Sequence, residues 1–238
     1  MTVNHADPEP QDGDNGTRRD RMAQALIRQL LQVVDEGVGP LTGAREYAQS
    51  REKILGNPEA AIRRIVRETM AQAGMAGFVT GLGGFITLPI ALPANIAGQA
   101  VLNARMVAAI AHLRGWDLND EVVRHSILLV VAGESPNQVL RQFGVRLGQQ
   151  LTATAIKRIP MAAIWAINKK AGFMLLAKYG TKRSLVTLAK GIPVTLAKGI
   201  PVAGAAIGSA VDATFTRTVA SLAKRSFSPV FDSQGDQR

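Results

Sequence analysis

Apolar residues recur at helical spacing along most of the chain, and the interruptions fall at capping residues, glycine and proline. Residue-by-residue alternation is absent and aromatic residues make up only 5 %, so no strand is predicted. The pattern therefore predicts an all-α fold, built as a single multi-helix domain. The predicted helices run from Asp20 to Gly37 or Gly39, over 44–55, from Asn57-Pro58 through Met70, over 94–113, from Asn119 to Gly133, from Ser135 to about 156, over 160–168 and over 202–224.

One segment departs from this pattern, because residues 71–104 contain no charged side chain. A membrane span needs about 20 apolar residues, so the length would suffice. Glycine, proline and polar residues break the run, however, at Gly83-Gly84, Pro89 and Pro93 among others. We therefore expect a glycine-rich, proline-broken helical hairpin that is embedded in a membrane or lies in its interface, rather than a straight span. Its lipid-contacting side chains are expected to be Phe78, Phe85 and Leu88.

Glycines three or four residues apart place a stripe of small residues on helix faces, where another helix can approach closely. The stripe comprises Gly74, Gly77, Gly81 and Gly84, and Gly204 and Gly208 repeat the spacing near the C-terminus. Such a stripe packs helices in membranes and equally in soluble bundles rich in alanine and glycine. Both interpretations stay open at this point.

Composition divides the chain into parts. Residues 1–19 are polar and acidic, and they predict a disordered tail because they bury too little apolar area to offset the entropy of ordering. Residues 20–57 form N-terminal helices, and residues 227–238 form a C-terminal tail. There is no cysteine, which excludes disulfides, thiolate zinc sites and cysteine nucleophiles. No signal peptide is visible, so we expect a location on the cytoplasmic side.

The net charge of +10 is concentrated in the second half of the chain. Residues 134–190 carry ten basic residues and one acidic residue, and no acid lies between Glu134 and Asp212. Such an excess attracts phosphate on lipid or on nucleic acid, although a solvated basic face without a partner is the plainer alternative. Nucleic-acid binding would also call for aromatic residues interleaved with the basic ones or a known reading motif. We therefore expect anionic lipid as the partner and no nucleic acid.

Within the basic region, lysines stand beside aromatic residues. This arrangement is typical of an interfacial anchor, in which aromatic rings lie at head-group depth and ammonium groups contact phosphate. The alternative is that the lysines only keep a helix end soluble. The predicted contacts are Trp165, Lys169, Lys170 and Phe173, extended by Lys178, Lys182 and Arg183.

Candidate chemistry is sparse. His112 and His125 lie near the ends of neighbouring helices, but their spacing to the acids between them matches no metal-ligand motif, and we expect no metal and no cofactor. Asp212 follows a long acid-free stretch, so a buried carboxylate there would need a cationic partner. Arg105 or a lysine near residue 170 is the expected partner, and a structural ion pair is favoured over a catalytic acid.

Three passages together resemble the EcsC family. The first is Thr80-Gly-Leu-Gly-Gly84, followed by Leu88-Pro89 and Leu92-Pro93-Ala94-Asn95. The second is Ile167-Asn168-Lys169-Lys170, followed by Gly172-Phe173 and Lys178-Tyr179-Gly180. The third is Ile200-Pro201-Val202-Ala203-Gly204, followed by Ile207-Gly208 and Asp212. The resemblance covers residues 58–226, an EcsC-like helical domain. One departure is that the octet VTLAKGIP occurs twice in tandem, at 186–193 and 194–201.

The resemblance implies a helical, membrane-associated protein with a link to transporter or secretion functions, and it transfers no catalytic residue. The leading hypothesis is thus a non-enzymatic accessory protein on the cytoplasmic side of a membrane, peripheral or partly embedded, with anionic lipid and a membrane protein as partners. The alternative is a helical hydrolase-like enzyme. It requires that His125, Asn168, Lys169 and Asp212 converge in one cavity.

Overall fold

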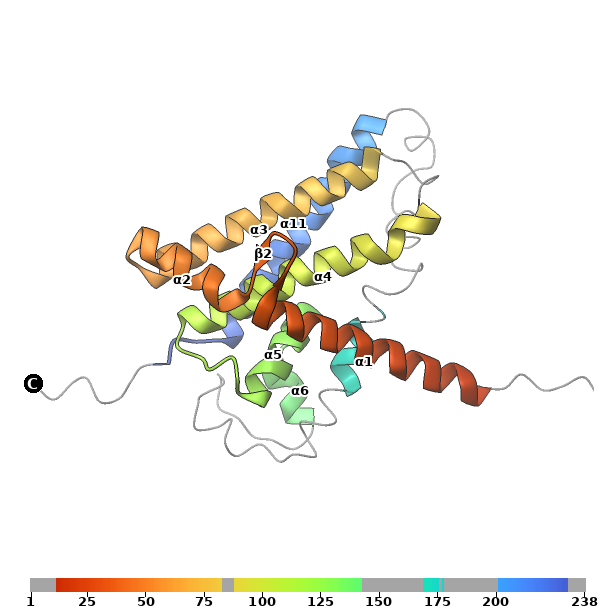
Figure 1. Cartoon of the computed structure of the whole chain (residues 1–238), viewed down its shortest axis with the longest axis horizontal. Coiled ribbons are helices and arrows are strands. Elements are labelled where there is room, and N and C mark those ends of the chain that lie inside the picture. Colours follow the sequence, from red (N-terminus) through yellow and green to blue (C-terminus); the bar gives the residue numbers. More distant parts are fainter. Residues whose placement is uncertain (1–11, 83–87, 143–168, 176, 178–200, 231–238) are drawn as a thin grey trace, which may run out of the picture.

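A computed structural model of the whole chain describes residues 12–82, 88–142, 169–175, 177 and 201–230. The described part is mainly helical, as the sequence predicts (Figure 1). The helices are α1 (Asp12–Glu36), α2 (Ala44–Leu55), α3 (Pro58–Leu82), α4 (Leu88–Leu113), α5 (Glu121–Val131), α6 (Pro136–Gln142) and α11 (Pro201–Ser226), and residues 169–175 are helical as well.

Helix α1 begins earlier than predicted. It starts at Asp12 instead of Asp20, so the predicted disordered tail of residues 1–19 is wrong for residues 12–19. After α1, Gly37 adopts a φ of 84°, a conformation that only glycine reaches without strain. The chain then forms a two-stranded antiparallel hairpin from β1 (Gly37–Val38) and β2 (Leu41–Thr42). Strands this short carry no alternation, which is why the sequence pattern gave no sign of them.

The corner between α2 and α3 follows the predicted signals closely. Gly56 ends α2 in the left-handed conformation, and its N–H donates to the carbonyl of Glu52. The side chain of Asn57 accepts a hydrogen bond from the N–H of Ala60, and Pro58 is the first residue of α3. These local signals turn the chain sharply and bring α2 against α3.

Helix α4 is the centre of the molecule and packs against α1, α2, α3, α5 and α11. Residues 106–111 of α4 are all fully buried. The break predicted at Gly83-Gly84 lies outside the described residues. Helix α4 already starts at Leu88 and continues through Pro93, which was expected to interrupt it. Pro89 lies in the first turn, where its missing N–H would have no intrahelical partner.

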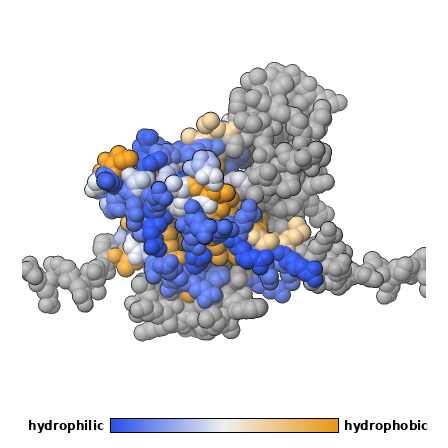
Figure 2. Space-filling model, viewed as in Figure 1, coloured by the Kyte–Doolittle hydropathy of each residue, from blue (hydrophilic) through white to orange (hydrophobic). Residues whose placement is uncertain are grey.

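The described side chains at the two ends of the uncharged segment differ in exposure: Ala71 and Met75 are exposed, Met75 to 70 %, whereas others lie inside the bundle. Ala73 on α3 and Ala100, Asn103 and Ala104 on α4 are fully buried. Among the described helices, none has the length and hydrophobicity needed to cross a membrane. The coloured part of the face in Figure 2 is mostly hydrophilic, with several small hydrophobic patches.

Helix α5 is capped one residue later than predicted. The carboxylate of Asp120, not Asn119, accepts hydrogen bonds from the N–H groups of Val122 and Val123. Nearly all of α5 is buried, and α6 begins at Pro136 as the Ser135-Pro136 signal predicts.

The C-terminal end after α11 is held in place through residue 230. Phe227 is fully buried with its ring edge-to-face against Trp116, their centroids 5.8 Å apart. The indole of Trp116 donates to the carbonyl of Ser228, and the N–H of Val230 donates to the carbonyl of Arg114. The first residues of the predicted C-terminal tail, 227–230, therefore pack against the end of α4 and the segment that follows it. Side chains from α1 and α2 share one hydrophobic core with α3, α4, α5 and α11.

Candidate functional site

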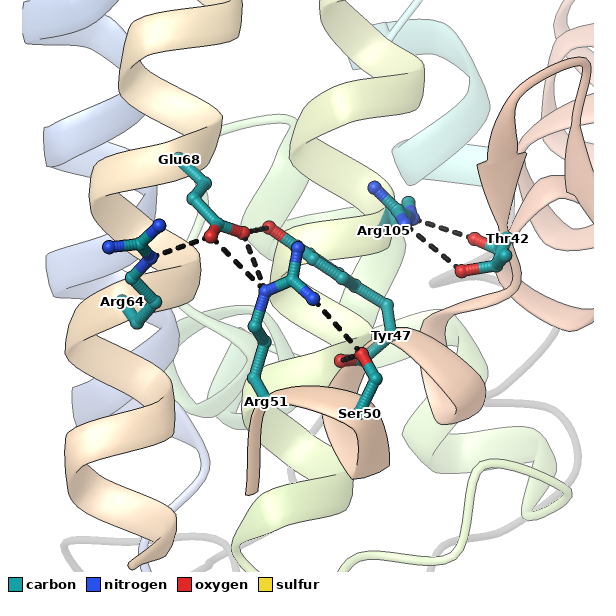
Figure 3. Close-up of polar contacts among 7 residues, drawn as sticks. All are labelled: Thr42, Tyr47, Ser50, Arg51, Arg64, Glu68 and Arg105. Atoms are coloured by element: carbon teal, nitrogen blue, oxygen red, sulfur yellow. Dashed lines mark hydrogen bonds and ion pairs between the residues drawn. The ribbon is translucent and has the colours of Figure 1, made fainter. Parts of the chain in front are cut away.

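A cluster of polar side chains lies where α2 and α3 face one another (Figure 3). Each helix contributes two residues one turn apart, Tyr47 and Arg51 on α2 and Arg64 and Glu68 on α3. Residues four apart share a helix face, so the tight α2–α3 corner brings these two pairs together. We call these four residues the Glu68 cluster.

The Glu68 carboxylate is the centre of this cluster. It accepts hydrogen bonds from Arg64 Nε at 2.6 Å, from Arg51 Nε at 2.9 Å and from the Tyr47 hydroxyl at 2.8 Å. Partial burial alone would raise the pKa of Glu68, but the bonds from Arg64, Arg51 and Tyr47 outweigh it and lower that pKa. Burial, together with the bond to Glu68, raises the pKa of Tyr47 to about 12. Tyr47 is thus a neutral donor, and the cluster is suited to holding two helices together.

Arg105 on α4 lies beside the Glu68 cluster, between Tyr47 and Thr42 (Figure 3). It is only 6 % exposed, and its guanidinium carbon lies 3.7 Å from the centroid of the Tyr47 ring. Its Nε donates to the carbonyl of Thr42 at 2.6 Å and its Nη2 to the Thr42 hydroxyl at 3.1 Å. Burial lowers the pKa of Arg105. Arg105 therefore ties α4 to the hairpin and to α2.

The predicted ion pair between Arg105 and Asp212 is wrong. Arg105 is directed toward Thr42 and Tyr47, and none of the ion pairs among the described residues includes Asp212. Asp212 lies instead on α11, which packs against α3 and α4. Burial raises the pKa of Asp212 to about 6. One turn further along α11, Thr216 accepts a hydrogen bond from the side-chain amide of Gln99 on α4.

The basic and aromatic segment is described only over 169–175 and at 177. Ala171 and Gly172 face inward, and a Cβ added to Gly172 would lie 2.9 Å from the Ile27 side chain of α1. Lys169 and Phe173 are exposed on the opposite face, one turn apart, and Phe173 is 62 % exposed. Lys170 is half-buried. The predicted contacts Phe85, Trp165, Lys178, Lys182 and Arg183 lie outside the described residues, as does Gly84.

Gly74 is the one glycine of the predicted stripe whose surroundings the structure describes, and it faces helix α11 of the same chain. A Cβ added to Gly74 would lie 3.6 Å from the carbonyl oxygen of Ser209, an ordinary van der Waals distance. The predicted packing glycines Gly77 and Gly81 lie further along α3, and Gly204 and Gly208 lie on α11, which packs against α3. Phe78 and Leu88 lie at the ends of α3 and α4 that flank residues 83–87.

The histidines take structural positions. His125 Nδ1 lies 2.6 Å from the carbonyl oxygen of Glu121, one turn earlier in α5. Burial and the charge of Arg45 lower the pKa of His112. Two of the acids between the histidines bind backbone N–H groups. Asp117 accepts a hydrogen bond from the N–H of Asn119, and Asp120 caps the N-terminus of α5. Within the described part of the chain, no group of three potential metal ligands occurs.

The residues on which an enzymatic function would depend lie on separate elements. His125 is on α5, Lys169 is in the segment beside α1, and Asp212 is on α11, while Asn168 lies outside the described residues. No hydrogen bond or ion pair found among the described residues joins any two of the three. The Glu68 cluster, in contrast, escaped the sequence reasoning. Its only local signals are the four-residue spacings of Tyr47 to Arg51 and of Arg64 to Glu68, which are common on helix surfaces.

Fold and surface define an all-α protein with a central buried helix, a paired polar cluster between α2 and α3 and an exposed lysine–phenylalanine face. The sequence model of the EcsC protein family matches residues 18–228. The chain therefore belongs to the EcsC family, and the match starts well before residue 58, where the resemblance in sequence was placed. No curated protein and no solved structure matches the chain.

Proposed function

We propose that this EcsC family member is a non-enzymatic accessory protein that docks reversibly on anionic lipid at the cytoplasmic side of a membrane. The observation that carries the proposal is the exposed face of residues 169–177. There, a phenylalanine ring faces solvent next to a lysine, while the opposite face of the same helix packs against α1. A ring held outward on a firmly packed helix is suited to insertion among lipid head groups.

Charge favours the anionic lipid. Residues 134–190 carry a net charge of +9, which includes Lys169, Lys170, Lys178, Lys182 and Arg183. Each basic residue near an anionic surface contributes about 1 kcal/mol, and burial of a phenylalanine contributes about 1.5–3 kcal/mol. The sum supports reversible docking without a membrane span. Further contacts from the region between α3 and α4, through Phe78, Phe85 and Leu88, belong to the same proposal, as does a membrane-protein partner in transport or secretion.

The test is flotation of the full-length protein with vesicles of phosphatidylcholine alone and with vesicles that also contain phosphatidylglycerol. The wild type is expected to float with the anionic vesicles. Phe173→Ser is expected to weaken this binding at least about tenfold, because the transfer energy of the ring is lost. Lys169→Glu is expected to weaken it by a similar factor, because one attraction is replaced by a repulsion.

Ile54→Ser is the matched control, since Ile54 on α2 is 72 % exposed and lies on another part of the molecule. It is expected to leave vesicle binding unchanged. Equal losses for Phe173→Ser and Ile54→Ser would show that the face of residues 169–177 has no special role. A wild type that stays with the soluble fraction in the presence of anionic vesicles would refute lipid docking altogether.

A further inference from the structure

Helices α3 and α11 lie side by side and antiparallel (Figure 1). Two contacts fix their register. Gly74 faces Ser209 near one end, and near the other end Arg114 donates both to Glu59 at 2.8 Å and to the carbonyl of Lys224 at 2.6 Å. Counting inward from either contact places residue 217 of α11 opposite residue 66 of α3.

The outward side of this helix pair is lined with arginines. Arg63 and Arg67 are exposed one turn apart on α3, whereas Ile62 and Ile65 beside them are fully buried. On α11, Arg217 and Arg225 are exposed, and the positions between them that face inward are Val219, Ala220 and Ala223. The register places Arg217 level with the turn between Arg63 and Arg67. We call Arg63, Arg67 and Arg217 the α3–α11 arginine face.

The acids of the two helices do not neutralise this face. Glu59 is bound to Arg114, and Glu68 is bound to Arg51 and Arg64. Asp212, the acid of α11, is half-buried. Among the residues that the structure describes, no ion pair involves any arginine of the α3–α11 arginine face. Three exposed arginines thus lie at one level of the α3–α11 helix pair, and none of them forms an ion pair with a described carboxylate.

The neighbouring side chains on α11 are small and neutral. The Thr218 hydroxyl donates to the carbonyl of Thr214 and the Ser221 hydroxyl to the carbonyl of Arg217, so both donors are satisfied within the helix. No described side chain on the exposed sides of α3 and α11 is aromatic. Single-stranded nucleic acid calls for rings on which bases can stack. Exposed arginines along a helix pair are instead suited to a layer of lipid phosphates.

We propose that the α3–α11 arginine face is a second docking surface for the phosphates of anionic phospholipid, separate from the face of residues 169–177. Helix α4 packs against α1 on one side and against α3 and α11 on another, and residues 169–175 lie with α1. The two faces therefore belong to different layers of the molecule, as Figure 1 also shows. The inference rests on the lipid docking proposed above, and it adds a further set of groups that bind phosphate.

The test compares two full-length variants that remove the same charge. One is Arg63→Ala/Arg67→Ala/Arg217→Ala, and the control is Arg45→Ala/Lys53→Ala/Arg141→Ala, whose three basic residues are exposed on α2 and α6. Binding is measured by flotation with phosphatidylglycerol-containing vesicles, and separately by filter retention of double-stranded DNA. Circular dichroism and thermal unfolding confirm that both variants are folded.

The first variant is expected to bind the anionic vesicles at least about tenfold more weakly than the wild type, given the contribution of each arginine at an anionic surface. The control is expected to change by less than about threefold, an effect of net charge alone. Equal losses in both variants, or no loss in the first, would overturn the inference. So would a loss confined to DNA retention, which would assign the face to nucleic acid.

The two proposals fail in different ways. A wild type that binds no anionic vesicles removes the proposed function and this inference together. A wild type that binds, and that loses binding through Phe173→Ser but not through the arginine variant, removes only the second docking surface.

Discussion

The two sides of α3 hold their arginines in contrasting ways. On the side that faces α2, Arg64 and Arg51 are both bound to Glu68, and the cluster joins two helices. On the side next to α11, Arg63 and Arg67 are exposed, and no carboxylate pairs with them in the described structure. Charge is thus used for internal cohesion on one side and is available to an external anion on the other. A net charge counted from the sequence cannot separate these two uses, because whether an arginine is paired depends on which acids lie near it in the fold.

The largest effect on stability is expected at Arg105. Arg105→Ala removes two hydrogen bonds to Thr42 and uncovers the Tyr47 ring, so the free energy of unfolding should fall by about 3–4 kcal/mol. Chemical denaturation measures this loss. Arg124→Ala is the control, because its ion pair with Asp35 is partly exposed and should contribute less than about 1 kcal/mol. Similar losses for the two variants would contradict the structural role given to Arg105.

The Glu68 cluster should show a somewhat smaller effect. Glu68→Ala leaves Arg51, Arg64 and the Tyr47 hydroxyl without their common acceptor, and we expect a loss of about 2–3 kcal/mol in unfolding free energy. Glu68→Gln keeps an acceptor and should lose about half as much. A loss below about 0.5 kcal/mol in Glu68→Ala would mean that α2 and α3 do not depend on the cluster.

Asp212 provides a pH-dependent test on the neighbouring helix. Its pKa rises from 3.8 to about 6 in the folded protein, so the folded state binds more protons than the unfolded state between these values. Its contribution to stability therefore falls as pH rises through this window. Asp212→Asn removes the titration and should stabilise the protein at neutral pH by about 1–2 kcal/mol, below the ~3 kcal/mol of the full shift because the group is only half-buried.

The difference between variant and wild type should disappear below the unfolded pKa of 3.8, where both states hold the proton. Thermal unfolding of both proteins across acidic and neutral pH measures this difference. If Asp212→Asn is less stable than the wild type at neutral pH, the carboxylate has a favourable partner that this account does not assign.

The smallest effect on stability is expected at the α3–α11 arginine face. Arg63→Ala, Arg67→Ala and Arg217→Ala should each change the unfolding free energy by less than about 0.5 kcal/mol, because exposed side chains without partners contribute little. Denaturation of the three single variants beside Glu68→Ala gives the comparison directly. A loss above 1 kcal/mol at any of them would show that the arginine has an internal partner, which would end its availability to lipid.

Local signals in the sequence predicted much of the fold. The residues from Ala44 to Pro58 gave the end of α2, its glycine cap and the start of α3, because each depends on neighbours in the chain. The extension of α1 to Asp12 and the docking of Phe227 were missed. Hydrogen bonds within the helix hold the first turns of α1, and contacts with distant Trp116 and Arg114 hold the C-terminal end. The contacts of the C-terminal end are long-range, so local composition does not reveal them.

The sites were predicted less well than the fold, because they depend more on contacts between residues far apart in the chain. Lys169 and Phe173 were predicted as membrane contacts because lysines stand beside aromatic residues in the sequence. The structure shows that both residues are exposed, and their contact with lipid stays a prediction. The partner of Arg105 was predicted wrongly, because the choice between Asp212 and Tyr47 depends on how α4 packs against α2 and α11. Ion pairing between helices is a long-range property, and the sequence alone ranks such partners poorly.

The most direct test of the account is the salt dependence with which the full-length wild type binds vesicles of matched size, neutral in one set and anionic in the other. The exposed arginines and lysines predict strong binding to the anionic set at low salt, a decrease of at least about tenfold toward physiological ionic strength, and little binding to the neutral set. Equal binding to both sets at every salt concentration would contradict the account, because it would mean that the exposed cationic groups take no part in docking.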